Sequence, residues 1–340
     1  MAKARIAVTE ALCLGGLSVA VWALLFADLS LAPVGSPGGV FSVLAIRAVH
    51  LLFIFIVFPH YLFSYVYAYS QDAAFAAKNR FALYVGPVLL VGLFALSLAL
   101  WNGYGRNILA YAFVGMVCLS GWHAAMQAFG TFVVYAQKAG YALTRVQRHV
   151  VLGHLYTVWL SDVFVLNAAG SVYSRNGLSA PAWGLPLIWI QVGNAAALAS
   201  LILVLAAVVA PNVRTQRRLP PAGACIALGA FYFWIIPARY VPVFAVAYPT
   251  IAHALQYLVF VNKVPSRNKY VLYAALVAVG FIFMELIPGW LDQSWATART
   301  GVGFFTLSVF VLVNLHHYLL DSRIWKRGNG NLLSKVLAQP

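Results

Sequence analysis

Residues 311–328, VLVNLHHYLLDSRIWKRG, close the last apolar run of the chain. The run is largely apolar up to Leu315, where two adjacent histidines follow, and Asp321 precedes a basic end. An apolar run with basic residues at its end is typical of a helix that crosses a membrane and ends at the cytoplasmic surface. The two imidazoles and the carboxylate are unusual there, because ionisable side chains inside a membrane are costly and are commonly functional.

The rest of the chain repeats this apolar pattern. Of its 340 residues, 63% are hydrophobic and only 9% are charged, which excludes an ordinary soluble domain. Apolar runs of about 20 residues, enough to cross a hydrocarbon core, recur along the whole length. We predict an all-α fold, a polytopic transmembrane helical bundle that forms a single transmembrane domain over residues 1–340 with short loops. The ten expected spans are residues 6–26, 43–69, 81–101, 107–136, 147–169, 183–210, 221–237, 240–262, 270–291 and 300–325.

The net charge of +15 follows from this topology and does not require nucleic acid as a partner. With the N-terminus in the cytoplasm, 17 of the 22 basic residues fall on the inner side. The outer side keeps Arg47, Arg106, Arg175, Arg239 and Arg299. This bias predicts a multi-pass protein with both termini inside, in the plasma membrane of a bacterium.

Histidines are the most informative polar residues. His60, His123, His253 and the pair His316 and His317 lie on the second, fourth, eighth and tenth expected spans, all of which run from outside to inside. At about 1.5 Å per residue, most of these imidazoles fall at a similar depth in the inner half of the membrane. His154, a turn into the fifth span, can reach the same layer. Imidazole is a common ligand of iron, zinc and copper, so the pattern predicts a metal site.

Polar neighbours support the metal hypothesis. Gln127 follows His123 by four residues, Gln256 follows His253 by three, and Asp321 follows His317 by four, so each pair shares a helical face. Such side chains are candidate acceptors for the second ring N–H of a ligating histidine. We favour His317 over His316 as a ligand because His317 shares its face with Asp321. A single histidine in a membrane helix is more commonly a helix-packing residue, and His316 can also face headgroups.

Other classes of site lack their signatures. Cys13, Cys118 and Cys225 lie in separate apolar segments without CxxC spacing, which argues against disulfides and thiolate metal sites. The chain also has no phosphate-binding loop, no HEXXH motif and no nucleophilic serine elbow.

Four short segments around the histidines resemble a known family. They are PHYLFS at His60, WHAAMQAFG at His123, AHALQYL at His253 and HHYLLDSRIW at His317 and Asp321. In order and in the closing His-x3-Asp they are similar to segments of the membrane-embedded β-carotene dioxygenases of the Brp/Blh type. The resemblance implies a non-haem iron that activates O₂, with His60, His123, His253 and His317 as its ligands. Tyr61 stands where the family has glycine, Tyr257 stands where it has a second late histidine, and this chain has more spans.

Together these features predict a membrane-embedded non-haem iron oxidoreductase or oxygenase. It would act with O₂ on a lipophilic substrate such as a carotenoid, an isoprenoid or an acyl lipid. Tyr257, Asp321 and the two glutamines are candidate catalytic or supporting residues. A second metal could bind if His154, His316 or Asp162 joins the site. Zinc or copper also suits the ligands. The alternatives are a haem- or quinone-linked electron-transfer protein and a proton-coupled transporter whose path is marked by Asp162, His123 and Glu285. The sequence leaves the oligomeric state open.

Overall fold

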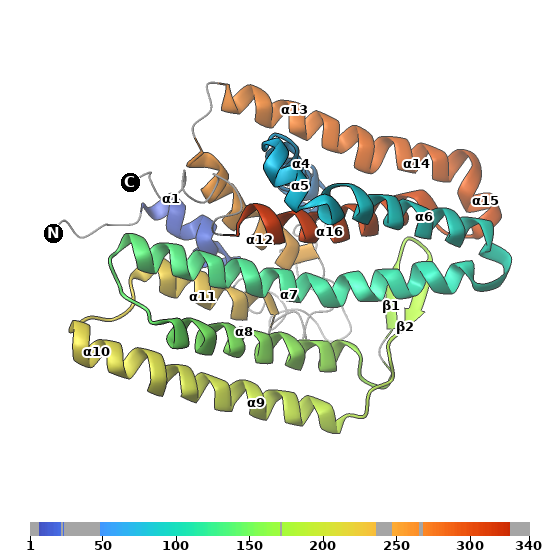
Figure 1. Cartoon of the computed structure of the whole chain (residues 1–340). Helices are drawn as coiled ribbons and strands as arrows, with labels where there is room; N and C mark the ends of the chain where they lie inside the picture. The colour runs from blue at the N-terminus through green and yellow to red at the C-terminus, as the bar shows by residue number, and fades with distance from the viewer. Residues whose placement is uncertain are drawn as a thin grey trace. The chain divides into compact units, whose positions relative to one another are not determined.

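The computed structural model of the chain describes residues 7–21, 23, 48–170, 172–235, 247–264 and 268–326. Nearly all of these residues are helical, as the sequence predicts (Figure 1). Seven helices in this part of the chain are long and apolar enough to cross a membrane. They are Ala48–Tyr69, Phe81–Ala99, Trp101–Lys138, Arg145–Leu166, Ile188–Gln216, Lys269–Thr300 and Phe304–Ile324.

These helices correspond to seven of the ten expected spans. The first and seventh spans contain shorter apolar helices, Val8–Val21 and Ala222–Ile235. The eighth contains α12 (Ala247–Asn262), and residues 236–246 lie outside the described residues. The membrane-protein class is therefore supported, while the count of ten spans and the orientation of the termini stay predictions.

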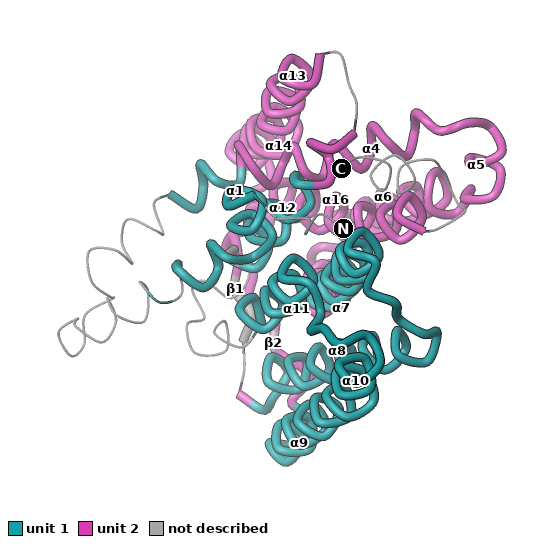
Figure 2. Tube along the Cα trace, turned by 90° about the vertical axis from the view of Figure 1, so that its left-hand side faces the viewer, with its two compact units in different colours: residues 1–53, 121–169, 185–259 teal, residues 54–120, 170–184, 260–340 magenta. Residues whose placement is uncertain are grey.

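Contacts divide the chain into two compact units (Figure 2). Unit 1 comprises Met1–Phe53, Gly121–Ala169 and Leu185–Val259. Unit 2 comprises Ile54–Ser120, Gly170–Gly184 and Phe260–Pro340.

Unit 1 is built around small residues on one long helix. Its elements are α1 (Val8–Ala11), η1 (Leu12–Gly16), the part of α7 (Arg106–Lys138) from Gly121 onward, α8 (Arg145–Leu166), α9 (Ile188–Val204), η5 (Leu205–Val209), α10 (Ala210–Gln216), α11 (Ala222–Ile235) and α12 up to Val259. Ala124, Ala125 and Ala128 on α7 allow the large rings of Phe231 and Trp234 on α11 to pack closely in the core. A capping box of Thr144 and Gln147 begins α8, which packs along α9.

Unit 2 surrounds the last helix of the chain. Its elements are η2 (Phe53–Val57), which begins in unit 1, α4 (Phe58–Tyr69), α5 (Ala73–Lys78), η3 (Phe81–Val85), α6 (Gly86–Ala99), η4 (Trp101–Gly105), the first part of α7, β1 (Val172–Arg175), β2 (Leu178–Pro181), α13 (Lys269–Phe281), η8 (Ile282–Leu286), α14 (Ile287–Leu291), η9 (Asp292–Ala296), α15 (Thr297–Thr300) and α16 (Phe304–Ile324). Helix α16 contacts α4, α6 and α14. The buried carboxylate of Asp292 caps the start of α16, accepting hydrogen bonds from the backbone N–H groups of Phe305 and Thr306 at 2.7 and 2.9 Å.

Prolines bend the long helices without ending them. The π-helical turns η2, η3, η5 and η8 each come just before a proline, at Pro59, Pro87, Pro211 and Pro288. Proline has no N–H to give to the carbonyl four residues earlier, and its ring clashes with that carbonyl, so the preceding turn widens.

Side chains from neighbouring helices satisfy three of the carbonyls that these prolines release. The Tyr273 hydroxyl donates to the carbonyl of Phe55, four residues before Pro59. The Tyr69 hydroxyl donates to Leu83, and Gln147 Nε2 donates to Ala207 at 3.3 Å. Because a bilayer supplies no water to such groups, these contacts allow the helices to continue through the prolines.

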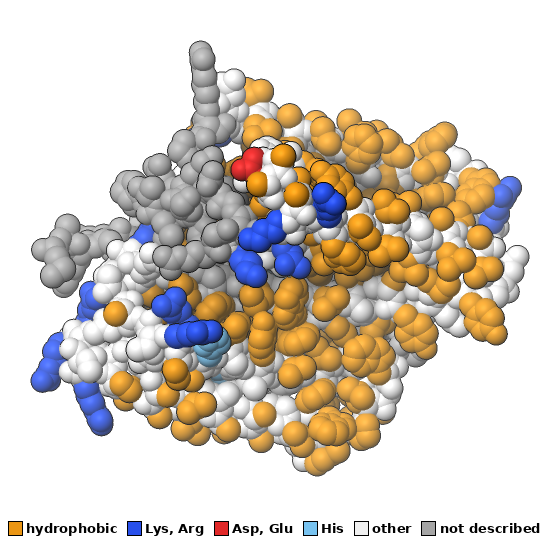
Figure 3. Space-filling model, in the orientation of Figure 1, with side chains coloured by type: hydrophobic (Ala, Val, Ile, Leu, Met, Phe, Trp, Pro, Cys, Tyr) orange, Lys and Arg blue, Asp and Glu red, His pale blue; other side chains and the backbone are white. Residues whose placement is uncertain are grey.

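Apolar side chains cover much of the exposed surface. Figure 3 shows many hydrophobic side chains on the described part of one face, with Lys and Arg gathered in a few groups. On α6 the side chains of Val88 and Leu89 are exposed, and on α13 those of Tyr270 and Val271 are exposed. Exposed apolar surface of this extent is typical of helices that face lipid.

One element departs from an all-helical fold. The short loop predicted between the fifth and sixth spans contains β1, which pairs in antiparallel fashion with β2. The tip is Asn176–Gly177, and both residues have positive φ (48° and 82°), as a two-residue hairpin turn requires. The hairpin is a small addition to the predicted helical bundle.

Candidate metal centre

In unit 2, α4 and α16 bring together His60 and His317. Both side chains are fully buried, and their ring centroids are 4.5 Å apart in an edge-to-face arrangement. Each helix also carries a second polar residue one turn later, Ser64 on α4 and Asp321 on α16. The two helices therefore face each other with matching pairs of polar side chains.

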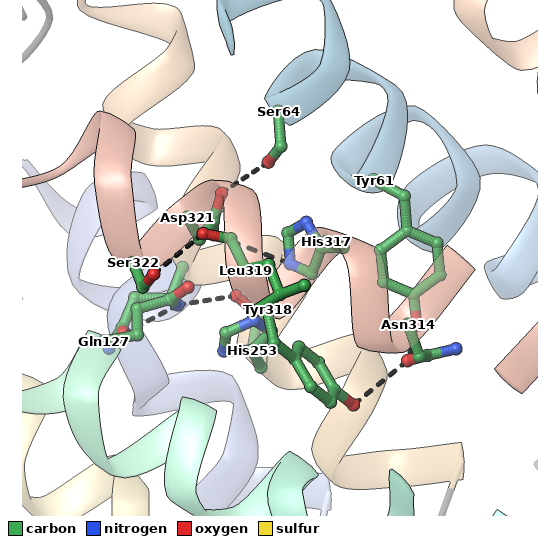
Figure 4. A network of polar contacts seen from close by, with 11 residues as sticks. Tyr61, Ser64, Gln127, His253, Asn314, His317, Tyr318, Leu319, Asp321 and Ser322 are labelled. Carbon is green, nitrogen blue, oxygen red and sulfur yellow. Dashed lines mark hydrogen bonds and ion pairs between the residues drawn. The ribbon is translucent and has the colours of Figure 1, made fainter. Parts of the chain in front are cut away.

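Asp321 links these pairs. His317 Nε2 lies 3.5 Å from Asp321 Oδ2, and the Ser64 hydroxyl donates to Asp321 Oδ1 at 2.6 Å (Figure 4). A carboxylate in this position favours the tautomer of His317 with its proton on Nε2, which leaves the lone pair on Nδ1 for a metal. The prediction that Asp321 supports His317 agrees with this contact.

A second polar network in unit 2 was not predicted. Asn314 Oδ1 accepts hydrogen bonds from the hydroxyls of Tyr61 at 2.7 Å and Tyr318 at 3.1 Å (Figure 4). The ring centroid of Tyr61 lies 5.0 Å from that of His317. The sequence signal for Asn314 is a lone amide in an apolar run, three residues before His317, on the same helical face.

In unit 1, α7 and α12 bring together a second pair, His123 and His253. Both are buried, and their ring centroids are 4.7 Å apart, again edge to face. The ring of Trp234 lies against His253 at 6.1 Å, and the Trp234 indole N–H donates to Ser18 Oγ at 3.1 Å.

The two glutamines make hydrogen bonds to main-chain carbonyls and to each other. Gln127 Nε2 donates to the backbone carbonyl of His253 at 2.9 Å and to Gln256 Oε1 at 3.0 Å. Gln256 Nε2 donates to the carbonyl of Leu14 at 2.8 Å. The amides therefore join α7, α12 and η1. That they also accept a ring N–H stays a prediction. Tyr257 is buried on α12, one turn after His253.

The four predicted ligands form a group that could hold a metal ion. His60, His123, His253 and His317 each offer one ring nitrogen, and these four atoms all lie within 4.8 Å of one another. Nitrogens on opposite sides of a metal ion are about 4 Å apart, since metal–nitrogen bonds are about 2.0–2.1 Å long. The spacing is thus close to what a single ion needs.

His154 and His316 have other surroundings. His154 contacts Ser200 Oγ through Nδ1 at 2.7 Å and the Tyr232 hydroxyl through Nε2. His316 contacts the Tyr65 hydroxyl through Nδ1 at 2.9 Å and the carbonyl of Ala82 through Nε2 at 2.8 Å. Both rings thus use both nitrogens in contacts with the protein, and neither histidine belongs to the group of four.

Comparison with known proteins adds no relative of the chain. No family model matches it, and neither the curated proteins nor the solved structures gave a match.

Proposed function

We propose that this protein is a membrane-embedded, iron-dependent oxidoreductase that uses O₂ to oxidise a lipophilic substrate. The observation that carries the proposal is the group of four buried histidines whose ring nitrogens lie within 4.8 Å of one another. His60, His123, His253 and His317 would hold the metal.

The donor set fits a first-row transition metal. It consists only of imidazole nitrogens, a set that suits iron, zinc and copper and does not suit magnesium or calcium. Four protein ligands would fill a tetrahedral zinc site, whereas iron with six positions would keep two open. When bound, iron would supply the capacity to activate O₂. Because O₂ needs an open coordination position, iron fits an oxidising enzyme better than tetrahedral zinc does.

The surrounding residues prepare the ligands and exclude water. Asp321 holds the proton of His317 on Nε2, and Ser64 fixes the carboxylate of Asp321. The four histidines are between 0% and 6% exposed, so the site is shielded from bulk solvent. A substrate would therefore come from the bilayer, which favours a carotenoid, an isoprenoid or an acyl lipid.

The geometry favours a bare ion over haem. Haem iron takes four nitrogens from its macrocycle and leaves only two axial positions for protein. Four imidazole nitrogens within 4.8 Å of one another would compete with that macrocycle for the same space. An electron-transfer protein with haem is accordingly the less favoured function.

Metal analysis of the full-length protein tests the proposal. We expect about one iron per chain in protein purified in detergent under anaerobic conditions, with no haem absorption band. His60→Ala, His123→Ala, His253→Ala and His317→Ala should each lower metal occupancy at least about tenfold, because each removes one ligand. Zinc or copper in place of iron would keep the site and change the reaction.

His316→Ala and His154→Ala are matched controls. Both remove an imidazole that is as buried as the proposed ligands, and both nitrogens of each ring are held by the protein. These variants should keep the metal if they stay monodisperse in size-exclusion chromatography. Full occupancy in all four ligand variants would overturn the site. A protein without metal and without a haem band would favour the transporter alternative.

Substrate turnover needs a separate test. Coexpression with carotenoid-producing enzymes, followed by pigment analysis with and without O₂, tests the carotenoid class. Pigment cleavage that depends on O₂ and is lost in His317→Ala would identify carotenoids as substrates. Unchanged pigments would exclude carotenoids and leave isoprenoids and acyl lipids as the substrate classes.

A further inference from the structure

The β1–β2 hairpin of unit 2 is held rigidly at its tip. The backbone N–H of Gly303 donates to the carbonyl of Asn176 at 2.9 Å. A Cβ atom on Gly177 would lie 3.2 Å from the carbonyl oxygen of Gly301, and the φ of Gly177 is +82°, so both space and conformation require glycine there. The tip is therefore fixed against the segment that leads into α16.

This anchoring determines where Arg175 points. Arg175 is paired with Leu178 across the hairpin, and paired residues project from the same face. Leu178 is fully buried, so Arg175 is directed toward the helices. Its guanidinium carbon lies 3.8 Å from the ring centroid of Phe310 on α16.

The guanidinium of Arg175 keeps N–H donors that are not used in hydrogen bonds within the part of the chain that the structure describes. Among the described residues, Arg175 makes no ion pair within 4.0 Å, and its buried Nε has no hydrogen-bond partner. Burial lowers the pKa of Arg175, and Tyr61 and Glu285 lie near enough to oppose part of this change. A partly buried arginine that stacks on an aromatic ring and keeps free donors is suited to bind an oxyanion in a bidentate manner.

Arg175 contacts the same face of α16 that carries His317, a proposed metal ligand. Phe310 and His317 are seven residues apart on α16, which places them on one face of the helix and about 10 Å apart along its axis. Tyr61, which influences Arg175 electrostatically, has its ring 5.0 Å from that of His317. Arg175 and His317 are thus connected through Phe310 on one face of α16 and through Tyr61 on α4.

We propose that Arg175 binds the anionic head of the lipophilic substrate, a carboxylate or a phosphate, and so sets the position of the apolar chain along α16. This inference rests on the proposed function, and it narrows the substrate class to amphiphiles with an oxyanion at one end. A neutral carotene would not use Arg175.

Ligand binding by the full-length protein in nanodiscs tests this inference without turnover. The probes are oleate, oleyl phosphate and methyl oleate, each measured by displacement of the fluorescent polyene cis-parinaric acid. We expect the wild type to bind at least one of the two anions about tenfold more tightly than the uncharged ester. Arg175→Gln should abolish that preference and leave the affinity for methyl oleate unchanged.

Arg299→Gln is the matched control, because Arg299 also stacks on an aromatic ring (Trp295, 4.4 Å) in unit 2 but is exposed. Arg175→Lys keeps the positive charge but lacks the planar guanidinium, and it should recover part of the preference for the anions.

The relative affinities of oleate and oleyl phosphate identify the head group. Equal binding of the ester and both anions by the wild type, or an unchanged preference in Arg175→Gln, would overturn the inference. Iron content, measured on the same samples, reports on the proposed function separately.

Discussion

The two histidine pairs have nearly the same geometry but different supports. His60 and His317 in unit 2 pack edge to face at 4.5 Å, and His123 and His253 in unit 1 pack in the same way at 4.7 Å. The unit 2 pair is backed by a carboxylate, Asp321, which contacts a ring nitrogen. The unit 1 pair is backed by amides that contact main-chain carbonyls.

Similar ring geometry is thus reached with two kinds of supporting side chain. A carboxylate on a ring N–H fixes the tautomer and increases the basicity of the ligand, so it acts on metal affinity. An amide on the backbone holds a helix in place, so it acts on stability. If the two units divide these tasks, substitutions in unit 2 should change metal affinity and substitutions in unit 1 should change stability.

Asp321→Asn should have the largest effect on the metal. The substitution keeps the shape of the side chain but removes the charge that holds the proton on His317, and we expect metal affinity to fall by about 10- to 100-fold. Competition with a chelator of known affinity measures this loss. Asp292→Asn is the matched control, since Asp292 is another aspartate that is 5% exposed and contacts α16, but through backbone N–H groups. Equal losses of affinity in both variants would show that Asp321 acts only through folding.

Gln256→Leu should lower stability and leave metal affinity nearly unchanged, the reverse of the effect expected for Asp321→Asn. It removes the hydrogen bonds to Gln127 and to the carbonyl of Leu14, and we expect the free energy of unfolding to fall by about 1–2 kcal/mol. Metal affinity should change less than about threefold. Thermal unfolding in detergent and chelator competition on the same sample separate the two effects. A tenfold loss of affinity with unchanged stability would mean that the unit 1 amides support a ligand after all.

Ser64→Ala should have the smallest effect. The hydroxyl donates to Asp321 at 2.6 Å and contacts His317 only through that carboxylate. We expect metal affinity to fall about three- to fivefold, as for the loss of one hydrogen bond of about 1 kcal/mol. In the Asp321→Asn background the same change should have a smaller effect, because the charged acceptor is already gone. Additive losses in the double variant would contradict this chain of contacts.

Much of the architecture and of the site follows from the sequence. The apolar runs predict the seven long helices because a bilayer permits few other structures. The depth of the histidines and the His-x3-Asp spacing predict the group of four and the contact of Asp321 with His317, since both depend on helical periodicity. The same periodicity did not separate His154 from these ligands, because its partners Ser200 and Tyr232 come from other helices.

Two features needed tertiary information or a closer reading of local signals. Asn314 has a clear signal as a buried amide, but its two tyrosine partners depend on how α4 meets α16. The hairpin could have been predicted from Asn176–Gly177, which is a strong turn signal, but its flanking strands are only four residues long. In a chain this apolar, short strands are easily taken for a loop between helices.

The hydrogen bond from Tyr273 to the carbonyl of Phe55 has a consequence for His60, the proposed metal ligand that follows on the same helix. Pro59 gives the carbonyl of Phe55 no N–H donor immediately before His60, and the Tyr273 hydroxyl on α13 donates to that carbonyl instead. Tyr273→Phe would remove this hydrogen bond and leave the carbonyl of Phe55 without that donor, while every imidazole stays in place. The backbone just before His60 therefore depends on a side chain of α13, so substitutions on that helix would change the proposed site without altering any of its ligands.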